Sequence, residues 1–274
     1  MGMEIKELTR PLQLSYIGQN FDLLVDEATH TRMPYAHFMI DAFTKELEQR
    51  QANRVQRRIK EARFPYKKYL VDLDLNEYDG DVRREIEDLS CLDFITGKEN
   101  VVLVANSGRG KTHLGIGLGI AACQADKRVL FTSVPNLVIE LKEAMSRNAL
   151  TTFRNKFLKF DIAIIDELGY ISFDKEGCDI LFNLISNRLN AGSIIVTTNL
   201  EFKEWVSVFK DPHLTGALVD RIARHAHVLD MSGPSYRLKE TKGWAAKKQD
   251  ARTPNKNNPL NNDLETMPAE SFSG

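Results

Sequence analysis

The sequence predicts an α/β domain with a doubly wound parallel sheet, preceded by a small all-α N-terminal domain. From residue 101 onward, β-branched apolar runs such as VVLV, VLF and IIV alternate with stretches of helical periodicity. Repeated strand–helix units of this kind predict parallel strands in one sheet, with a ligand at their C-terminal ends. Before residue 70, apolar residues recur at helical spacing. We expect a helical domain over 1–70, the α/β domain over 71–246, and a disordered tail over 247–274, which is rich in Asn, Pro and Ser.

The stretch over 101–119 predicts a strand, a phosphate-binding loop and a helix. Backbone N–H groups of the loop would surround a phosphate at the positive end of the helix. The residues that would supply them are Ser107, Gly108, Arg109, Gly110, Lys111 and Thr112. Lys111 would reach the β- and γ-phosphates, and the Thr112 hydroxyl would bind Mg²⁺. Ala105 replaces the usual first glycine, which costs little if its φ is negative. An ordinary glycine-rich turn is the alternative, but it gives Lys111 no role.

Two later strands end in polar residues. Asp166 and Glu167 follow the apolar run IAII, about fifty residues after the loop, where Asp166 would hold Mg²⁺ through water. Glu167 would orient and deprotonate the attacking water. An acidic loop that caps a strand is the alternative for this pair. After the strand expected over 193–198, Asn199 could position the lytic water or cap the next helix.

Local signals predict several further elements. A helix is expected over 83–94 and a strand over 128–133, with Pro135 in the first turn of the following helix. Three alternate glycines occur in the helix after the loop, where each costs about 1 kcal/mol relative to alanine. These are Gly115, Gly117 and Gly119. They predict close packing of this helix against the sheet.

The N-terminal domain shows two apolar stripes and a basic stretch. The stripes are Leu12, Ile17, Phe21 and Leu24, and Phe38, Ile40, Phe43 and Leu47. Between Lys45 and Lys68, nine basic residues stand against three acidic ones, although the whole chain has a formal net charge of −1. This segregation predicts a polyanionic partner. The candidates for DNA binding are Arg50, Arg54, Arg57, Arg58, Lys60, Arg63, Lys67 and Lys68. The alternative is a solvated helix face with no partner.

The composition limits the possible protein classes. At 274 residues and 42% hydrophobic content, the chain can form a large core plus a smaller domain. Its three cysteines are isolated, so they predict neither a metal pair nor a disulfide framework. No apolar run approaches the roughly 18 residues of a membrane span. We therefore expect a cytoplasmic protein without membrane contact.

The combined motifs resemble those of the IstB family, the AAA+ helper ATPases of IstA/IstB-type insertion sequences, which are related to the DnaC/DnaI helicase loaders. The resemblance covers about residues 8–245. It rests on RRIKEARFP, LDFITGKENVVL, SGRGKTHL, IIDELGY, TTNLEF, ALVDR and SYRLKE. This combination is more specific than a phosphate-binding loop alone. The chain departs from the usual family pattern G-P-P-G-T-G-K-T at Ala105, Asn106 and Arg109.

The resemblance implies an AAA+ P-loop NTPase that uses ATP and Mg²⁺ and binds duplex DNA largely without sequence preference. It further implies a homo-oligomeric ring or filament that remodels target DNA and recruits or activates an IstA-like transposase. By motif position, the implied roles are Lys111 and Thr112 in Walker A, Asp166 and Glu167 in Walker B, Asn199 as sensor 1, Arg221 as arginine finger and Arg237 as sensor 2. Arg221 and Arg224 share one helix face, and salt bridges to Asp220 or Asp230 are the alternative for both.

Two other functions compete with this hypothesis. A replicative helicase loader would use its N-terminal domain to bind a helicase, whereas the long basic helix favours DNA or a transposase. A metabolic P-loop kinase would need an acceptor pocket and a lid, and the sequence shows no sign of either.

Overall fold

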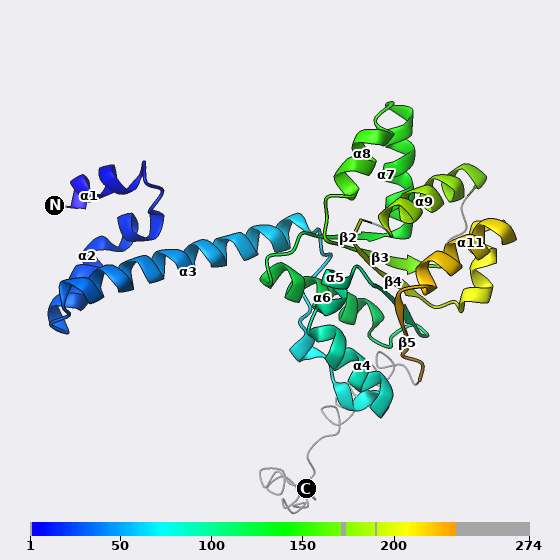
Figure 1. Ribbon diagram of the computed structural model, residues 1–274, viewed down its shortest axis with the longest axis horizontal. Coiled ribbons are helices and arrows are strands. Elements are labelled where there is room, and N and C mark those ends of the chain that lie inside the picture. Colours follow the sequence, from blue (N-terminus) through cyan, green and yellow to red (C-terminus); the bar gives the residue numbers. More distant parts are fainter. Residues whose placement is uncertain (1, 171–173, 190, 234–274) are drawn as a thin grey trace, which may run out of the picture. The chain divides into compact units, whose positions relative to one another are not determined.

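The computed structural model describes residues 2–170, 174–189 and 191–233. Arg237 and the expected tail lie outside the described residues. Within the described part, five parallel strands form one sheet in the order β2-β3-β4-β1-β5 (Figure 1). The strands are β1 (Asn100–Val104), β2 (Val129–Ser133), β3 (Ile162–Leu168), β4 (Ser193–Thr198) and β5 (Ala226–Asp230). The predicted fold class is confirmed.

Helices cover both faces of the sheet (Figure 1). Alternate strand residues point to opposite faces, so Val101 and Leu103 of β1 lie in one core and Val102 lies in the other. The first core includes α6 (Lys111–Gln124) and α4 (Gly80–Ser90). The second includes α7 (Val134–Ser146), α8 (Leu150–Phe157), α9 (Lys175–Arg188), α10 (Val206–Phe209) and α11 (Pro212–Ala223). The sheet is therefore doubly wound, as predicted.

The predicted strand limits agree with the structure. The strand expected over 128–133 is β2, and the strand expected over 193–198 is β4. Pro135 lies in the first turn of α7, where its missing N–H has no helical partner to lose. Turn and strand signals in this half of the chain were therefore sufficient to place these elements.

The helix predicted over 83–94 is wrong in its limits. The chain instead forms α4 and the short α5 (Asp93–Gly97). Asp79 accepts a hydrogen bond from the N–H of Val82 at 3.1 Å, and this cap starts α4 three residues early. At Leu92 the backbone is left-handed, with φ 65°, which separates the two helices.

The N-terminal helices are α1 (Gly2–Thr9), α2 (Ser15–His30) and α3 (Tyr35–Glu61). Their core is small, because its buried apolar residues are Ile17, Leu24 and Ala42. The first predicted stripe is only partly right, since Leu12 is 66% exposed. The second is wrong as a packed stripe, because Ile40 and Leu47 are 64% and 65% exposed.

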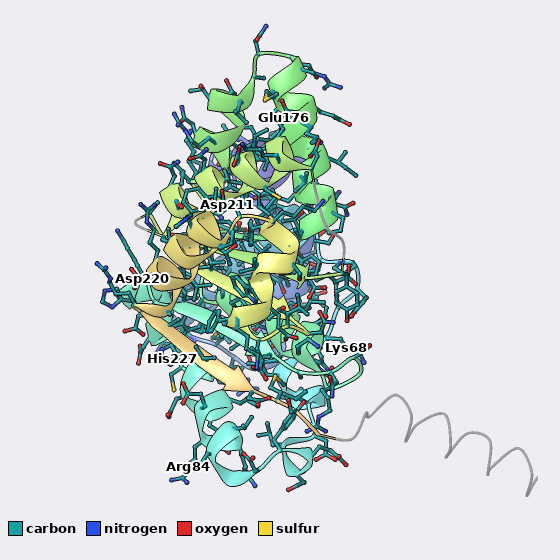
Figure 2. All side chains as sticks on the ribbon, turned by 90° about the vertical axis from the view of Figure 1, so that its right-hand side faces the viewer. Lys68, Arg84, Glu176, Asp211, Asp220 and His227 are labelled. Carbon is teal, nitrogen blue, oxygen red and sulfur yellow. The ribbon has the colours of Figure 1, made fainter. Side chains whose placement is uncertain are left out.

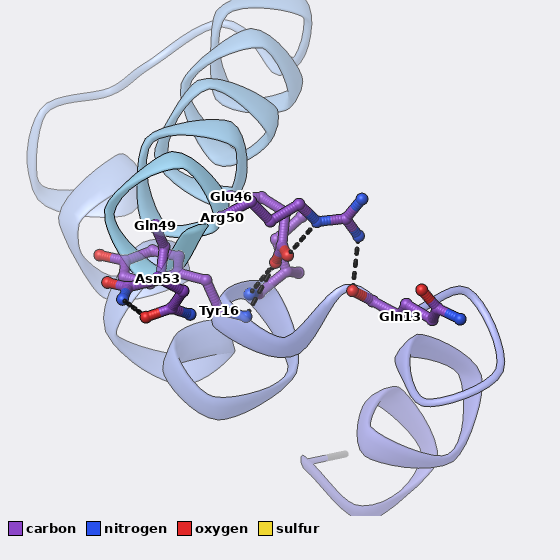
Figure 3. Close-up of polar contacts among 7 residues, drawn as sticks. Gln13, Tyr16, Glu46, Gln49, Arg50 and Asn53 are labelled. Carbon is purple, nitrogen blue, oxygen red and sulfur yellow. Dashed lines mark hydrogen bonds and ion pairs between the residues drawn. The ribbon is translucent and has the colours of Figure 1, made fainter. Parts of the chain in front are cut away.

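The second apolar stripe was predicted wrongly because Glu46, a charged residue, occupies the contact between α3 and α2 (Figure 3). Its carboxylate accepts hydrogen bonds from the backbone N–H groups of Tyr16 and Ile17 at 2.8 and 3.1 Å, in the first turn of α2. Burial alone would raise the pKa of Glu46, but hydrogen bonds from Ile17, Arg50 and Tyr16 hold it below its ordinary value. The start of α2 thus rests on a buried carboxylate, which the helix dipole favours.

The end of α3 packs into the core on the face of the sheet that α6 covers. Ile59 and Ala62 are buried in the cluster that contains α6, and the carbonyl of Ala62 accepts a hydrogen bond from the N–H of Phe131 on β2 at 2.8 Å. The domain boundary near residue 70 stays a prediction. None of the described helices combines the length and apolar character needed to cross a membrane.

His227 holds the edge strand β5 (Figure 2). Its two ring nitrogens lie 2.7 Å from a carboxylate oxygen of Glu85 on α4 and 2.9 Å from one of Glu99, just before β1. Partial burial lowers the pKa of His227, but hydrogen bonds to Glu99 and Glu85 outweigh it, so the pKa is raised overall. A protonated ring can donate to both carboxylates at once.

The predicted close packing of α6 against the sheet is confirmed at Gly119 but not at all three alternate glycines. A Cβ on Gly119 would lie 2.6 Å from Ile164 and 2.8 Å from Phe64, whereas one on Gly115 would lie 3.5 Å from Ile164. A Cβ on Gly117 would lie 2.8 Å from Leu70. Gly119 is therefore a position of close approach to the sheet, while Gly115 has room for a methyl group.

We expect Gly119→Ala to lower the free energy of unfolding by about 1–3 kcal/mol, because the new methyl group overpacks the core. Gly115→Ala is the matched control in the same helix. It should leave stability unchanged or raise it by up to about 1 kcal/mol through helix propensity. Urea denaturation of both variants measures the difference, and equal stability would contradict close packing at Gly119.

Candidate functional site

The loop between β1 and α6 has the conformation of a phosphate-binding loop. Gly108 and Gly110 have φ values of 83° and 84°, which only glycine adopts easily. α6 begins at Lys111, so its free N–H groups follow the loop directly. Ala105 has no positive φ, is buried, and donates its N–H to the carbonyl of Thr198 at 3.2 Å. Alanine is accommodated here because the residue still continues the strand.

Lys111 is buried at the mouth of this loop. Its Nζ donates to the carbonyls of Ala105 at 2.6 Å and Asn106 at 3.0 Å. The ammonium group thereby lies over the loop whose N–H groups would hold a phosphate.

Asp166 joins three elements at the C-terminal edge of the sheet. It is 6% exposed, and its Oδ1 accepts hydrogen bonds from the hydroxyls of Thr112 on α6 at 3.0 Å and Thr197 on β4 at 2.5 Å. A hydroxyl and a carboxylate are hard oxygen ligands that suit Mg²⁺, which also keeps several waters and phosphate oxygens. The two predicted metal ligands, Thr112 and Asp166, are thus brought together.

Glu167 lies beside this cluster but in a different environment. The register of β3 with β4 shifts between Ile165 and Leu168, and Glu167 has a φ of 66°. Its backbone N–H donates to the Thr197 hydroxyl at 3.0 Å, while its side chain is exposed. This irregular strand end separates the buried carboxylate of Asp166 from an accessible one on the next residue.

Thr197 is the site residue that sequence reasoning missed. It is 1% exposed, and its single hydroxyl contacts both acidic positions, donating to Asp166 and accepting from the N–H of Glu167. The polar end of the strand was a visible signal, but it led to Asn199. The parallel pairing of β3 with β4 also brings the Thr197 hydroxyl to Asp166.

Asn199 is exposed at the end of β4. Its side-chain oxygen lies 3.2 Å from where a Cβ on Gly169 would be, so it is close to the end of β3. The alternative role as a helix cap is wrong, because Glu201 caps the following turn, Phe202–Trp205.

The side chain of Arg109 fixes the loop to the rest of the domain. It is 4% exposed, and its guanidinium donates to the carbonyls of Met231, Glu77 and Ser232 at 2.8, 3.1 and 3.3 Å. It also stacks over the ring of Tyr78, whose hydroxyl donates to the Arg109 carbonyl at 2.9 Å. Because the guanidinium has these partners, the backbone N–H of Arg109 is the group that we expect to contact a phosphate.

The two arginines of the α11 region differ in their surroundings. Arg224 pairs with Asp220 at 3.5 Å, which is the alternative that the sequence left open. Arg221 is exposed, and its guanidinium lies 5.8 Å from the ring centre of Phe182. Arg221 forms no ion pair with any described residue.

The basic stretch divides into paired and unpaired residues. Arg58 lies 2.6 Å and Arg54 lies 3.4 Å from Asp126, at the end of α6, and Arg63 lies 2.8 Å from Glu140. Arg50 pairs with Glu46 at 2.9 Å, and Arg57 lies 3.9 Å from Glu61. The remaining candidates, Lys60, Lys67 and Lys68, are exposed and make no ion pair within the described ranges.

A family model described as "IstB-like ATP binding protein" matches residues 7–243. The chain belongs to this family. It is 33% identical over 237 residues to a protein of insertion sequence IS21 from Pseudomonas aeruginosa, covering 86% of this chain and 89% of that one. It is also 33% identical over 229 residues to a protein of insertion sequence IS232 from Bacillus thuringiensis, covering 84% and 92%. Both relatives are named as ATP-binding proteins, and the predicted family is confirmed.

Solved structures share the fold of this IstB-like chain. The crystal structure of DnaI has a TM-score of 0.50 and 21% identity, and the match covers 61% of this chain and 89% of that one. DnaA from Aquifex aeolicus with bound AMPPCP also has a TM-score of 0.50, at 17% identity, covering 65% and 54%. These matches show that the chain shares its fold with both structures.

Proposed function

We propose that this IstB-like protein hydrolyses ATP, assembles on duplex DNA, remodels it, and recruits or activates a transposase. The observation that carries the proposal is the cluster of Thr112, Asp166 and Thr197, with Glu167 exposed beside it, behind a formed phosphate-binding loop. The relatives are named as ATP-binding proteins of insertion sequences, which supports a role in transposition.

Each side chain of the site has a separate role in the proposed hydrolysis. Lys111 and the loop N–H groups bind the phosphates, and Thr112 and Asp166 would hold Mg²⁺, which neutralises developing phosphate charge when bound. Glu167 is accessible to solvent, so it can orient a water and accept its proton. Asn199, next to the end of β3, would hydrogen-bond the same water.

Arg221 supports a site that is completed by a neighbouring subunit. An exposed guanidinium without a described ion pair is free to reach another molecule, and an arginine finger supplied in trans stabilises transition-state charge. We assign Arg237 the role of a second sensor by motif position. ATP bound at subunit junctions would then favour a ring or filament.

The unpaired basic residues support contacts with DNA phosphates. Lys60, Lys67 and Lys68 are exposed and near one another in sequence, and lysine contacts to phosphate carry no base information. Binding would therefore be largely independent of sequence and would weaken with salt.

The proposal predicts particles that form only with both ATP·Mg²⁺ and a duplex of roughly 50 base pairs, a length that spans several subunits. Light scattering and phosphate release, measured together with each component omitted in turn, test this. Turnover should rise when duplex is added. Monomers in every condition, together with tight binding to a replicative helicase, would instead support the helicase-loader hypothesis.

A mixing experiment tests whether Arg221 acts in trans. Glu167→Gln and Arg221→Ala should each bind ATP and lose at least about tenfold in turnover. A mixture of the two should recover part of the activity, because some junctions pair an intact Glu167 with an intact Arg221. Arg224→Ala is the matched control and should stay active. No recovery on mixing would contradict a shared site.

Thr197 should act by positioning Asp166 and Glu167. Thr197→Val keeps the shape but removes the hydroxyl, so turnover should fall about 10- to 100-fold with ATP affinity within about threefold of wild type. Thr197→Ser restores the hydroxyl and should recover most of the rate. Equal losses in both variants would show that only packing matters at this position.

A further inference from the structure

A groove lies between the first two helices and α3, outside the nucleotide site. Its volume is about 820 Å³, and its charged lining residues are all basic. They are Lys6, Arg10, Arg50, Arg54 and Arg57. The other lining residues include neutral hydrogen-bonding groups such as Gln13 and Asn53. Lys6 and Arg10 lie far from the basic stretch in sequence, but in the folded chain they line the same groove as its arginines.

Specific contacts hold the two walls of this groove together. A Cβ on Gly18 would lie 2.3 Å from the Thr9 hydroxyl oxygen, so glycine allows α1 to approach α2. Glu46 fixes the start of α2 on α3, and Arg50 donates to the carbonyl of Gln13 (Figure 3). The groove is therefore formed by the fold and does not depend on a ligand to assemble it.

The basic side chains of α3 have a spacing that suits an extended anion. Arg50, Arg54 and Arg57 are four and three residues apart and share one helix face. They span about 10 Å of helix, a length over which duplex DNA carries roughly six phosphate charges.

Arg54 and Arg57 remain available for new contacts, whereas Arg50 is held by Glu46 at 2.9 Å. Arg54 is 3.4 Å from Asp126 and Arg57 is 3.9 Å from Glu61, with both pairs well exposed, and exposed ion pairs of this kind contribute little. Lys6 and Arg10 are exposed and unpaired as far as the structure is described. By contrast, Arg58 and Arg63 are held by close carboxylates at 2.6 and 2.8 Å.

We propose that this groove binds the phosphodiester backbone of duplex DNA, with Lys6 and Arg10 as phosphate contacts. The inference rests on the proposed DNA binding and names its site. Arg58 and Arg63, which the sequence placed among the DNA-binding candidates, instead join α3 to the α/β core. Phosphate is the ligand because a groove with several guanidinium groups and no carboxylate matches a repeated anion.

The test is fluorescence anisotropy of a labelled random duplex of roughly 30 base pairs at several salt concentrations, with ATP·Mg²⁺ present. Lys6→Gln with Arg10→Gln should weaken binding at least about tenfold and reduce the salt slope by about 2, since each lost phosphate contact removes about 0.9. Arg63→Gln is the matched control, because it removes a basic residue outside the groove, and it should bind as wild type does. Arg10→Lys should retain the slope.

The outcomes separate the two proposals. A wild-type protein that binds no duplex in any condition would overturn the proposed function itself. Wild-type binding with an unchanged affinity and slope in the Lys6 and Arg10 double variant would overturn only the groove. Thermal unfolding confirms that each variant is folded.

Chemical acetylation provides a second measurement, which uses the wild-type chain and reports the reactivity of Lys6. Added duplex should protect Lys6 from acetylation. Lys159, which precedes β3, is the control and should stay reactive. If duplex leaves Lys6 as reactive as before, the proposed DNA binding by the groove is wrong.

Discussion

The buried carboxylate of Asp166 is the constraint on which the rest of the site depends. At 6% exposure it needs hydrogen-bond donors, and these come from Thr112 at the start of α6 and Thr197 at the end of β4. The same carboxylate thus fixes the loop helix against two strands. Because the Thr197 hydroxyl also receives the N–H of Glu167, the irregular end of β3 is set by the same contact. One desolvated group therefore orients both the proposed metal ligands and the residue proposed to activate water.

α6 connects this site to the N-terminal helices. Its first turn holds Thr112, and just beyond its last turn Asp126 accepts hydrogen bonds from Arg58 and Arg54 of α3. Those bonds hold the pKa of the Asp126 carboxyl below its ordinary value, with the Arg58 hydrogen bond as the largest cause. Gly119 lets the second half of this helix lie close to the sheet. α6 therefore connects the basic helix α3 to the phosphate-binding loop.

The sequence was sufficient for the fold class and for the family, because both depend on local patterns. Strand β4 and the phosphate-binding loop were predicted from apolar runs and glycines that act within a few residues. What failed depended on contacts between distant segments. The buried role of Glu46 requires the start of α2, thirty residues away. The role of Thr197 requires the strand pairing, and the division of the basic stretch into paired and unpaired residues requires Asp126 and Glu140.

Arg109 shows how a departure from the family pattern can be structural. Here the guanidinium donates to carbonyls of Glu77 before the sheet and of Met231 and Ser232 after β5, so the loop is fixed to two segments at once. Gly110 adds to this, because Tyr78 lies so close that a Cβ there would be 2.5 Å from its hydroxyl. The loop is therefore held in place by hydrogen bonds of the Arg109 side chain to carbonyls on both sides of it in the sequence.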